Sequence, residues 1–207
     1  MENRTKFYKS GEWVNDTPSQ RYIKICLALR AHQYGILTKD DLNFVIKNAL
    51  VSKIYVSESV VYEINKAVGG KAGYTIFGNL EPLLSKIVVS GLDYKDFEIC
   101  KLRDKIYNLR KNGKKPLLPP IIVEHVVPGD VYIEKVKSLY NTGCFTFSEF
   151  KKIFDKISIC LVTKTQNDDL DTAKLKSQMP PKYKDFITFP FARYDIKYGG
   201  VGIKIVK

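Results

Sequence analysis

The chain has 207 residues, of which 34 are Lys or Arg and 22 are Asp or Glu, so its formal net charge is +12. This length can bury a core without disulfide or zinc staples, and the four cysteines (Cys26, Cys100, Cys144 and Cys160) offer no Cys-x-x-Cys pair for a zinc ribbon. The charge favours a polyanionic partner, nucleic acid first, and a basic protein without such a partner is the alternative. No stretch has the length of a membrane span and no apolar leader begins the chain, so we expect a complete cytoplasmic protein without a membrane partner.

The first part of the chain has the apolar spacing of helices. Apolar residues recur at helical spacing over 22–29 and 42–49, with Gly35 in the turn between these segments and Thr38 placed to cap the second helix. A third helix is predicted over 59–68. Two helices joined by a short turn are also the pattern of a helix-turn-helix, although many helical hairpins share it.

A further helix, over 94–111, carries a basic cluster, whereas the segment 81–89 fits a helix or a strand equally. The basic residues of this helix and of the loop after it are Lys101, Arg103, Lys105, Arg110, Lys111, Lys114 and Lys115. A solvated helix face is one interpretation of this cluster. The other is contact with nucleic-acid phosphates, which its place just before Glu124-His125 favours.

The next segments are expected to alternate between strands and helices. After a break at three prolines, an apolar run predicts a strand over 121–127. Aromatic and aliphatic residues at helical spacing predict helices over 133–140 and 147–154, and Thr146 with Glu149 has the spacing of a capping box for the second one.

The last part of the chain is again predicted to hold a strand followed by a helix. A second strand is predicted over 157–162, and Thr163 with Gln166 forms a capping-box pattern that opens a helix reaching about Lys176. The tail from Pro180 is rich in aromatic residues and glycine, and we expect it to end in a strand over 202–206.

Glu124 and His125 stand together near the end of the first predicted strand, and His125 is one of only two histidines in the chain. A carboxylate beside an imidazole can hold a divalent cation with the first group and remove a proton with the second. A single histidine at a strand end is more often a hydrogen-bonded packing residue. The other histidine, His32, lies among polar neighbours on a helix and is interpreted as structural.

This part of the chain resembles the ββα-metal nucleases of the HNH (His-Me finger) family. The matching residues are Glu124-His125, two apolar residues and Pro128 after a strand, then a second strand and a helix whose first turn holds Asn167. The resemblance covers about residues 119–176. It implies a ββα-metal core (116–207) with an expanded loop between its two strands. Because the apolar spacing predicts a mostly helical region (1–115), to which we assign a possible DNA-binding or specificity role, the whole chain is expected to have an α+β fold. Both regions could pack as one unit.

The resemblance implies a role for each matching residue. Glu124 and Asn167 would bind Mg²⁺ or Mn²⁺, and His125 would be the general base that takes a proton from the attacking water. Oxygen donors and several retained waters are what Mg²⁺ prefers, and no zinc is expected. Asn141 is the candidate for bracing the connecting loop.

Two further basic residues are candidates for nucleic-acid contact. Lys164 opens the helix that holds Asn167, and Arg193 in the aromatic tail would either clamp the cleaved phosphate or be an ordinary surface residue.

The sequence therefore predicts a metal-dependent endonuclease acting on double-stranded DNA, of a restriction or mobile-element type. One such site cuts one strand, so a double-strand break would need a homodimer or two successive encounters. The alternative is a non-catalytic basic DNA-binding protein in which the helices of residues 18–50 form a helix-turn-helix. A third hypothesis is an inhibitor or scaffold that binds another protein.

Overall fold

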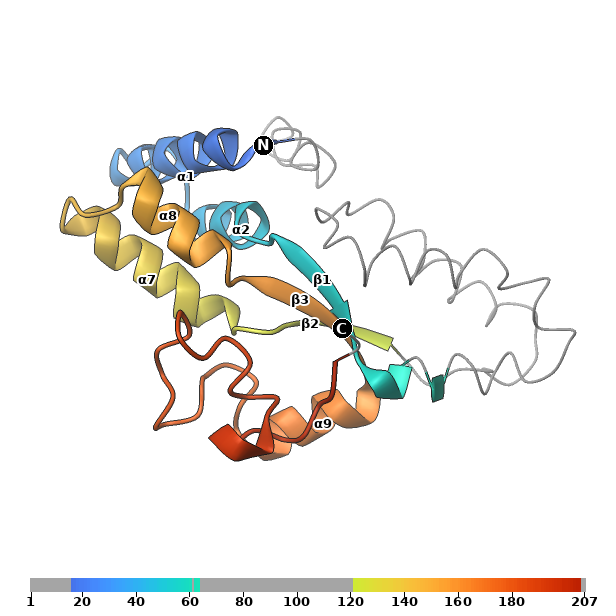
Figure 1. Ribbon diagram of the computed structural model, residues 1–207. Coiled ribbons are helices and arrows are strands. Elements are labelled where there is room, and N and C mark those ends of the chain that lie inside the picture. Colours follow the sequence, from blue (N-terminus) through green and yellow to red (C-terminus); the bar gives the residue numbers. More distant parts are fainter. Residues whose placement is uncertain (1–15, 61, 64–120, 206–207) are drawn as a thin grey trace, which may run out of the picture.

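The computed structural model describes residues 16–60, 62–63 and 121–205, which form a mixed α+β fold around a small sheet (Figure 1). The strands are β1 (Lys53–Val56), β2 (Ile121–His125) and β3 (Ser158–Thr163), in the spatial order β1-β3-β2. The central strand β3 runs parallel to β1 and antiparallel to β2. Strand β2 is therefore an edge strand of the sheet.

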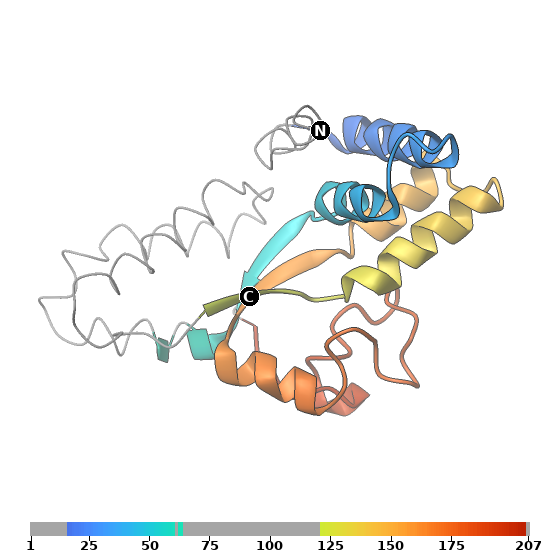
Figure 2. The same ribbon diagram turned by 180° about the vertical axis from the view of Figure 1, so that it is seen from behind.

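Helices cover the sheet on both sides (Figure 1 and Figure 2). On one side lie α1 (Pro18–Gln33), α2 (Lys39–Ala49), α7 (Gly129–Asn141) and α8 (Phe147–Phe154). On the other side lie α9 (Lys164–Thr172) and the C-terminal tail, which contains a short 3₁₀ helix, η2 (Ile196–Tyr198). No helix within the described ranges is long and apolar enough to cross a membrane.

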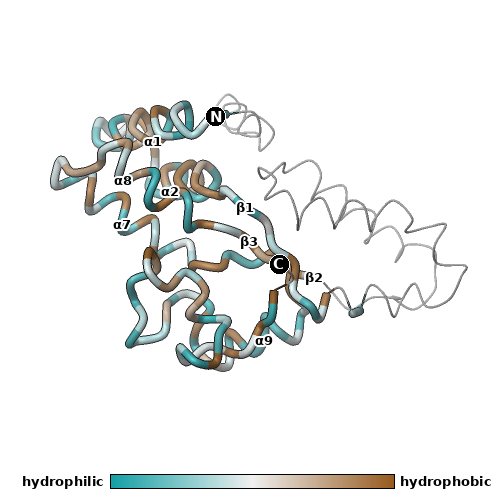
Figure 3. Tube along the Cα trace, in the orientation of Figure 1, coloured by the Kyte–Doolittle hydropathy of each residue, from teal (hydrophilic) through white to brown (hydrophobic). Residues whose placement is uncertain are grey.

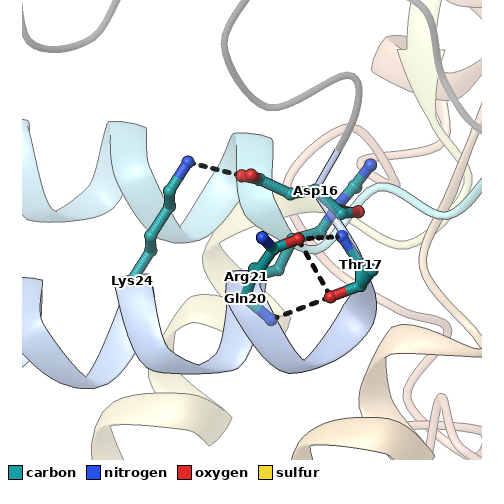
Figure 4. A network of polar contacts seen from close by, with 5 residues as sticks. All are labelled: Asp16, Thr17, Gln20, Arg21 and Lys24. Carbon is teal, nitrogen blue, oxygen red and sulfur yellow. Dashed lines mark hydrogen bonds and ion pairs between the residues drawn. The ribbon is translucent and has the colours of Figure 1, made fainter.

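Local capping fixes where these helices begin. The Thr17 side chain accepts a hydrogen bond from the backbone N–H of Gln20, and the Gln20 side chain bonds back to the backbone of Thr17 (Figure 4). Lys24 and Asp16 form an ion pair of 2.6 Å over the same turn. The same reciprocal arrangement, which satisfies two amides that a helix start leaves without partners, caps α2 at Thr38 and α9 at Thr163. The sequence prediction of both caps is confirmed.

Two hydrophobic clusters lie on the two faces of the sheet, because successive side chains of a strand point to opposite faces. The larger cluster combines Ile159 and Leu161 of β3 with buried residues of α1, α2, α7 and α8, and the tail also adds Met179, Phe186 and Ala192 to it. The smaller cluster combines Cys160 and Val162 of β3 with Leu170 of α9 and residues of the tail. Figure 3 shows hydrophobic and hydrophilic residues alternating around the helices, so that each helix turns an apolar side to one of these clusters.

Several sequence predictions need correction. The tail forms no strand over 202–205 and makes only an isolated bridge between Ile205 and Ser57. Its backbone amides instead bond to carbonyls of the tail itself, with Gly202 N–H donating to Tyr194 O at 2.8 Å, and Gly199 and Gly202 turn the chain at positive φ. The helix expected to reach Lys176 ends at Thr172.

Other predictions are confirmed in part. Thr146 caps α8 by accepting from the N–H of Glu149, but the Glu149 side chain pairs with Lys152 and does not close the box. Residues 58–60 and 62–63 are helical, and the rest of the helix predicted over 59–68 lies outside the described residues. The segments 81–89 and 94–111 also lie outside them. Strand β1 was not predicted.

Candidate functional site

Glu124 lies on the face of the sheet that α9 and the tail cover. It is opposite Cys160 in the register of β2 and β3, and its side chain is 13% exposed. Its carboxylate accepts a charge-assisted hydrogen bond from the guanidinium of Arg193. Burial and the negative charge of Glu124 both raise the pKa of the Cys160 thiol, which keeps this thiol neutral beneath the carboxylate.

Arg193 is fully buried, so it is neither the exposed phosphate clamp nor the surface residue that the sequence suggested. Besides Glu124, it donates a hydrogen bond of 3.1 Å to the backbone carbonyl of Lys176. The tail folds tightly around it, because a Cβ at Gly200 would lie 2.5 Å from the carbonyl group of Arg193. A charge so deeply buried needs a partner, and the carboxylate that provides it is Glu124.

Asn167 lies on the same face of the sheet as Glu124. It is half-buried in the first turn of α9, one turn before Leu170, which packs into the smaller cluster. Helix α9 follows β3 directly and contacts both β2 and β3. Within the described part of the chain, the Asn167 amide makes no hydrogen bond. Two oxygen donors predicted to bind a metal are therefore placed on one face.

His125 points to the opposite face, since it follows Glu124 directly in a regular strand. Its ring centroid lies 6.2 Å from that of Tyr132 in α7. Burial, and then the positive charges of Lys47 and Arg193, lower the pKa of His125 to about 3. The imidazole is therefore neutral at physiological pH, and burial and the two cations make it a weaker base than an exposed histidine. The structure does not bring all three predicted residues to one face.

Lys47 of α2 was not among the residues singled out from the sequence. Its side chain runs over Gly129, with Cε 3.4 Å and Nζ 3.8 Å from the position that a Cβ of this glycine would take. Its charge also acts on His125. No local pattern marks this lysine, because only the packing of α2 on α7 places it beside the end of β2.

The remaining predicted residues do not join this group. Asn141 is exposed in the last turn of α7, about 18 Å along the helix from Gly129 at a rise of 1.5 Å per residue, so it does not brace the residues after β2. Lys164 is exposed and forms an ion pair with Asp168. The basic residues Lys101, Arg103, Lys105, Arg110, Lys111, Lys114 and Lys115 lie outside the described residues.

The two oxygen donors on the α9 face are of the chemical kind that a hard cation takes while it keeps most of its waters. They are one carboxylate and one amide, which are oxygen ligands of the kind that Mg²⁺ takes in small numbers. The described residues contain no group of three or more His, Cys, Asp or Glu that could enclose a metal ion. The Arg193 guanidinium offsets part of the charge of Glu124, so any cation bound here would be held weakly.

Comparison with known proteins adds no relative to this description. No family model matches the chain, and neither a curated protein nor a solved structure matches it.

Proposed function

We propose that this protein is a metal-dependent endonuclease that hydrolyses DNA phosphodiester bonds, with β2, β3 and α9 as a ββα-metal core of the HNH type. The observation that carries the proposal is the arrangement of this unit: an antiparallel strand pair leads directly into a capped helix that packs back on it. Glu124 and Asn167 share the covered face of this unit, and His125 ends the first strand.

Each residue has a distinct role in the proposed reaction. Glu124 and Asn167 would hold Mg²⁺, which when bound supplies charge stabilisation for the phosphate as negative charge builds on its oxygens. Arg193 fixes the Glu124 carboxylate in position through the ion pair. His125 would accept the proton of the attacking water. Because burial and two cations lower its pKa, bound DNA phosphate would have to offset these charges for it to act as the base.

Glu124 and His125 would reach one phosphate from opposite faces of the sheet, because both lie at its edge. Strand β2 is an edge strand, and both residues lie at its very end. A DNA strand crossing this edge would meet Glu124 from one face and His125 from the other. Hydrogen bonds of catalytic groups often tighten only when substrate binds.

The helix-turn-helix alternative has less support from the described residues. A recognition helix usually meets bases with its N-terminal residues. The first turn of α2 holds Asp40 and Asp41, whose charges would repel DNA phosphates. Its buried residues pack against α1 and α7 in the larger cluster. We therefore assign these helices a supporting role at the catalytic unit.

The proposal is tested by plasmid cleavage with Mg²⁺ or Mn²⁺, for which we expect products with a 5′-phosphate and a 3′-hydroxyl. H125A should abolish cleavage and keep DNA binding in EDTA, since it removes only the proton acceptor. H32A is the matched control, because His32 lies in α1, away from the proposed site, with its Nδ1 2.8 Å from the turn carbonyl of Leu37. Cleavage by H125A at the rate of the unmodified protein would refute the assignment.

The same assay addresses the number of strands cut. A monomer with one site should first nick a supercoiled plasmid, and linear product should follow later. Linear product that appears without a nicked intermediate, together with a dimer in solution, would instead support paired sites of a restriction type.

A further inference from the structure

We propose that Lys47 binds a backbone phosphate of the DNA beside His125, so that α2 supplies a substrate-binding residue to the catalytic unit. This inference rests on the proposed nuclease function and extends it to a residue from a distant part of the chain. A lysine ammonium is a compact charge with three donors, suited to a phosphate oxygen.

The first observation is that the core fixes the helical segment that carries Lys47. In α2 the neighbours Val45, Ile46 and Ala49 are buried in the larger cluster, whereas Lys47 itself is exposed. Its stem packs on Gly129, whose missing side chain leaves the room, with Cδ 3.7 Å from the position of a Cβ. The ammonium group is therefore directed to the start of α7, four residues after His125.

The second observation is the charge balance around this ammonium group. Lys24 and Lys164 each pair with an acidic residue, but none of the ion pairs within the described residues includes Lys47. Asp130, in the first turn of α7, makes no such pair either. The charge of Lys47 acts on the imidazole of His125 and, together with the chain's positive charge, favours an anion at this corner, against the single negative charge of Asp130.

The charge and the hydrogen-bond donors around Lys47 also indicate the chemistry of the expected ligand. The chain carries a net charge of +12, which attracts polyanions in general. At this corner α7 has no side-chain cap from Pro128. The Val131 N–H bonds to the Pro128 carbonyl at 3.1 Å, and the N–H groups of Gly129 and Asp130 are donors near the lysine. A phosphodiester that approaches His125 from this face would meet the ammonium group first. We therefore assign to Lys47 a phosphate of the strand that is cut.

The experiment compares K47A and K47R with K39A in the full chain. Lys39 is a matched control, because it is an exposed lysine at the opposite end of α2 that forms no ion pair with the other residues that the structure describes. Affinity for a fluorescent DNA duplex is measured in EDTA at several salt concentrations, and plasmid cleavage is measured with Mg²⁺.

Loss of one phosphate contact should lower the salt slope of binding by about 1 in K47A. Cleavage by this variant should be slower by about 10- to 100-fold, since a charge that stabilises the reacting phosphate is gone. K47R should retain most of both properties, and K39A should match the unmodified protein.

The outcomes separate this inference from the proposed function. Unmodified protein that cuts DNA, with K47A equal to K39A in slope and rate, overturns the inference and leaves the nuclease intact. Protein that binds DNA but never cuts it refutes the nuclease, while a reduced slope in K47A would still support the phosphate contact. Protein that does not bind DNA at all overturns both.

Discussion

On the face of the sheet covered by α9 and the tail, Glu124 and Arg193 form a buried ion pair, whereas on the face covered by α7 a half-buried imidazole lies beside an unpaired lysine. The first face balances its charges within the protein. The second face, at Lys47, has no acidic partner within the described residues. The comparison assigns the buried ion pair a stabilising role on the α9 face, and it supports the proposal that a phosphate binds at Lys47 on the α7 face.

Breaking the ion pair should have the largest effect. R193M leaves the Glu124 carboxylate buried without a partner, which should lower the free energy of unfolding by about 3–5 kcal/mol. Urea unfolding followed by circular dichroism measures this change. The double variant E124L/R193M, which removes both charges, should recover much of the loss. Equal stability of R193M and the unmodified protein would show that the tail face does not depend on this pair.

Lowering the pH should destabilise the protein through His125, on the face covered by α7. The pKa of His125 is lowered to about 3 in the folded state, while an unfolded histidine takes up its proton near pH 6.5. The unfolded state therefore binds more protons between these values, and the free energy of unfolding falls as the pH drops, by at most about 1.4 kcal/mol per pH unit.

The measurement is a set of urea titrations in EDTA from pH 7.5 to pH 4. H125N has no imidazole to protonate, so its free energy of unfolding should fall less steeply with decreasing pH below 6.5. Parallel curves for H125N and the unmodified protein would mean that His125 is not held neutral by burial.

Substitutions at two glycines, one on each face of the sheet, test the same comparison and should have smaller effects on stability. G200A places a Cβ 2.5 Å from the backbone of Arg193, which cannot yield easily, and should cost about 1–3 kcal/mol. G129A meets only the flexible stem of Lys47 at 3.4 Å and should change stability by less than about 1 kcal/mol. Thermal unfolding of both variants gives the contrast. A G200A protein as stable as G129A would show that the tail packs less tightly around Arg193.

The helix boundaries of the described region could largely be predicted, because capping acts over three or four residues. Thr38 and Thr163 start their helices as expected, and Gly143, at a φ of 69°, follows the end of α7. The two strands of the second half were expected within a few residues of β2 and β3. Strand β1 escaped prediction because its four residues pair with β3, more than a hundred positions away.

The candidate site, too, could be predicted from the sequence only in part. The sequence by itself determined that a carboxylate and an imidazole end an apolar strand, and that a capped helix with an amide in its first turn follows a second strand. Only the tertiary structure decided which face each side chain takes, since strand alternation separates Glu124 from His125. It also decided that the tail brings Arg193 to Glu124 and that α2 brings Lys47 to His125. Local patterns record turns, caps and periodicity, whereas these pairings arise when distant segments bury a common core.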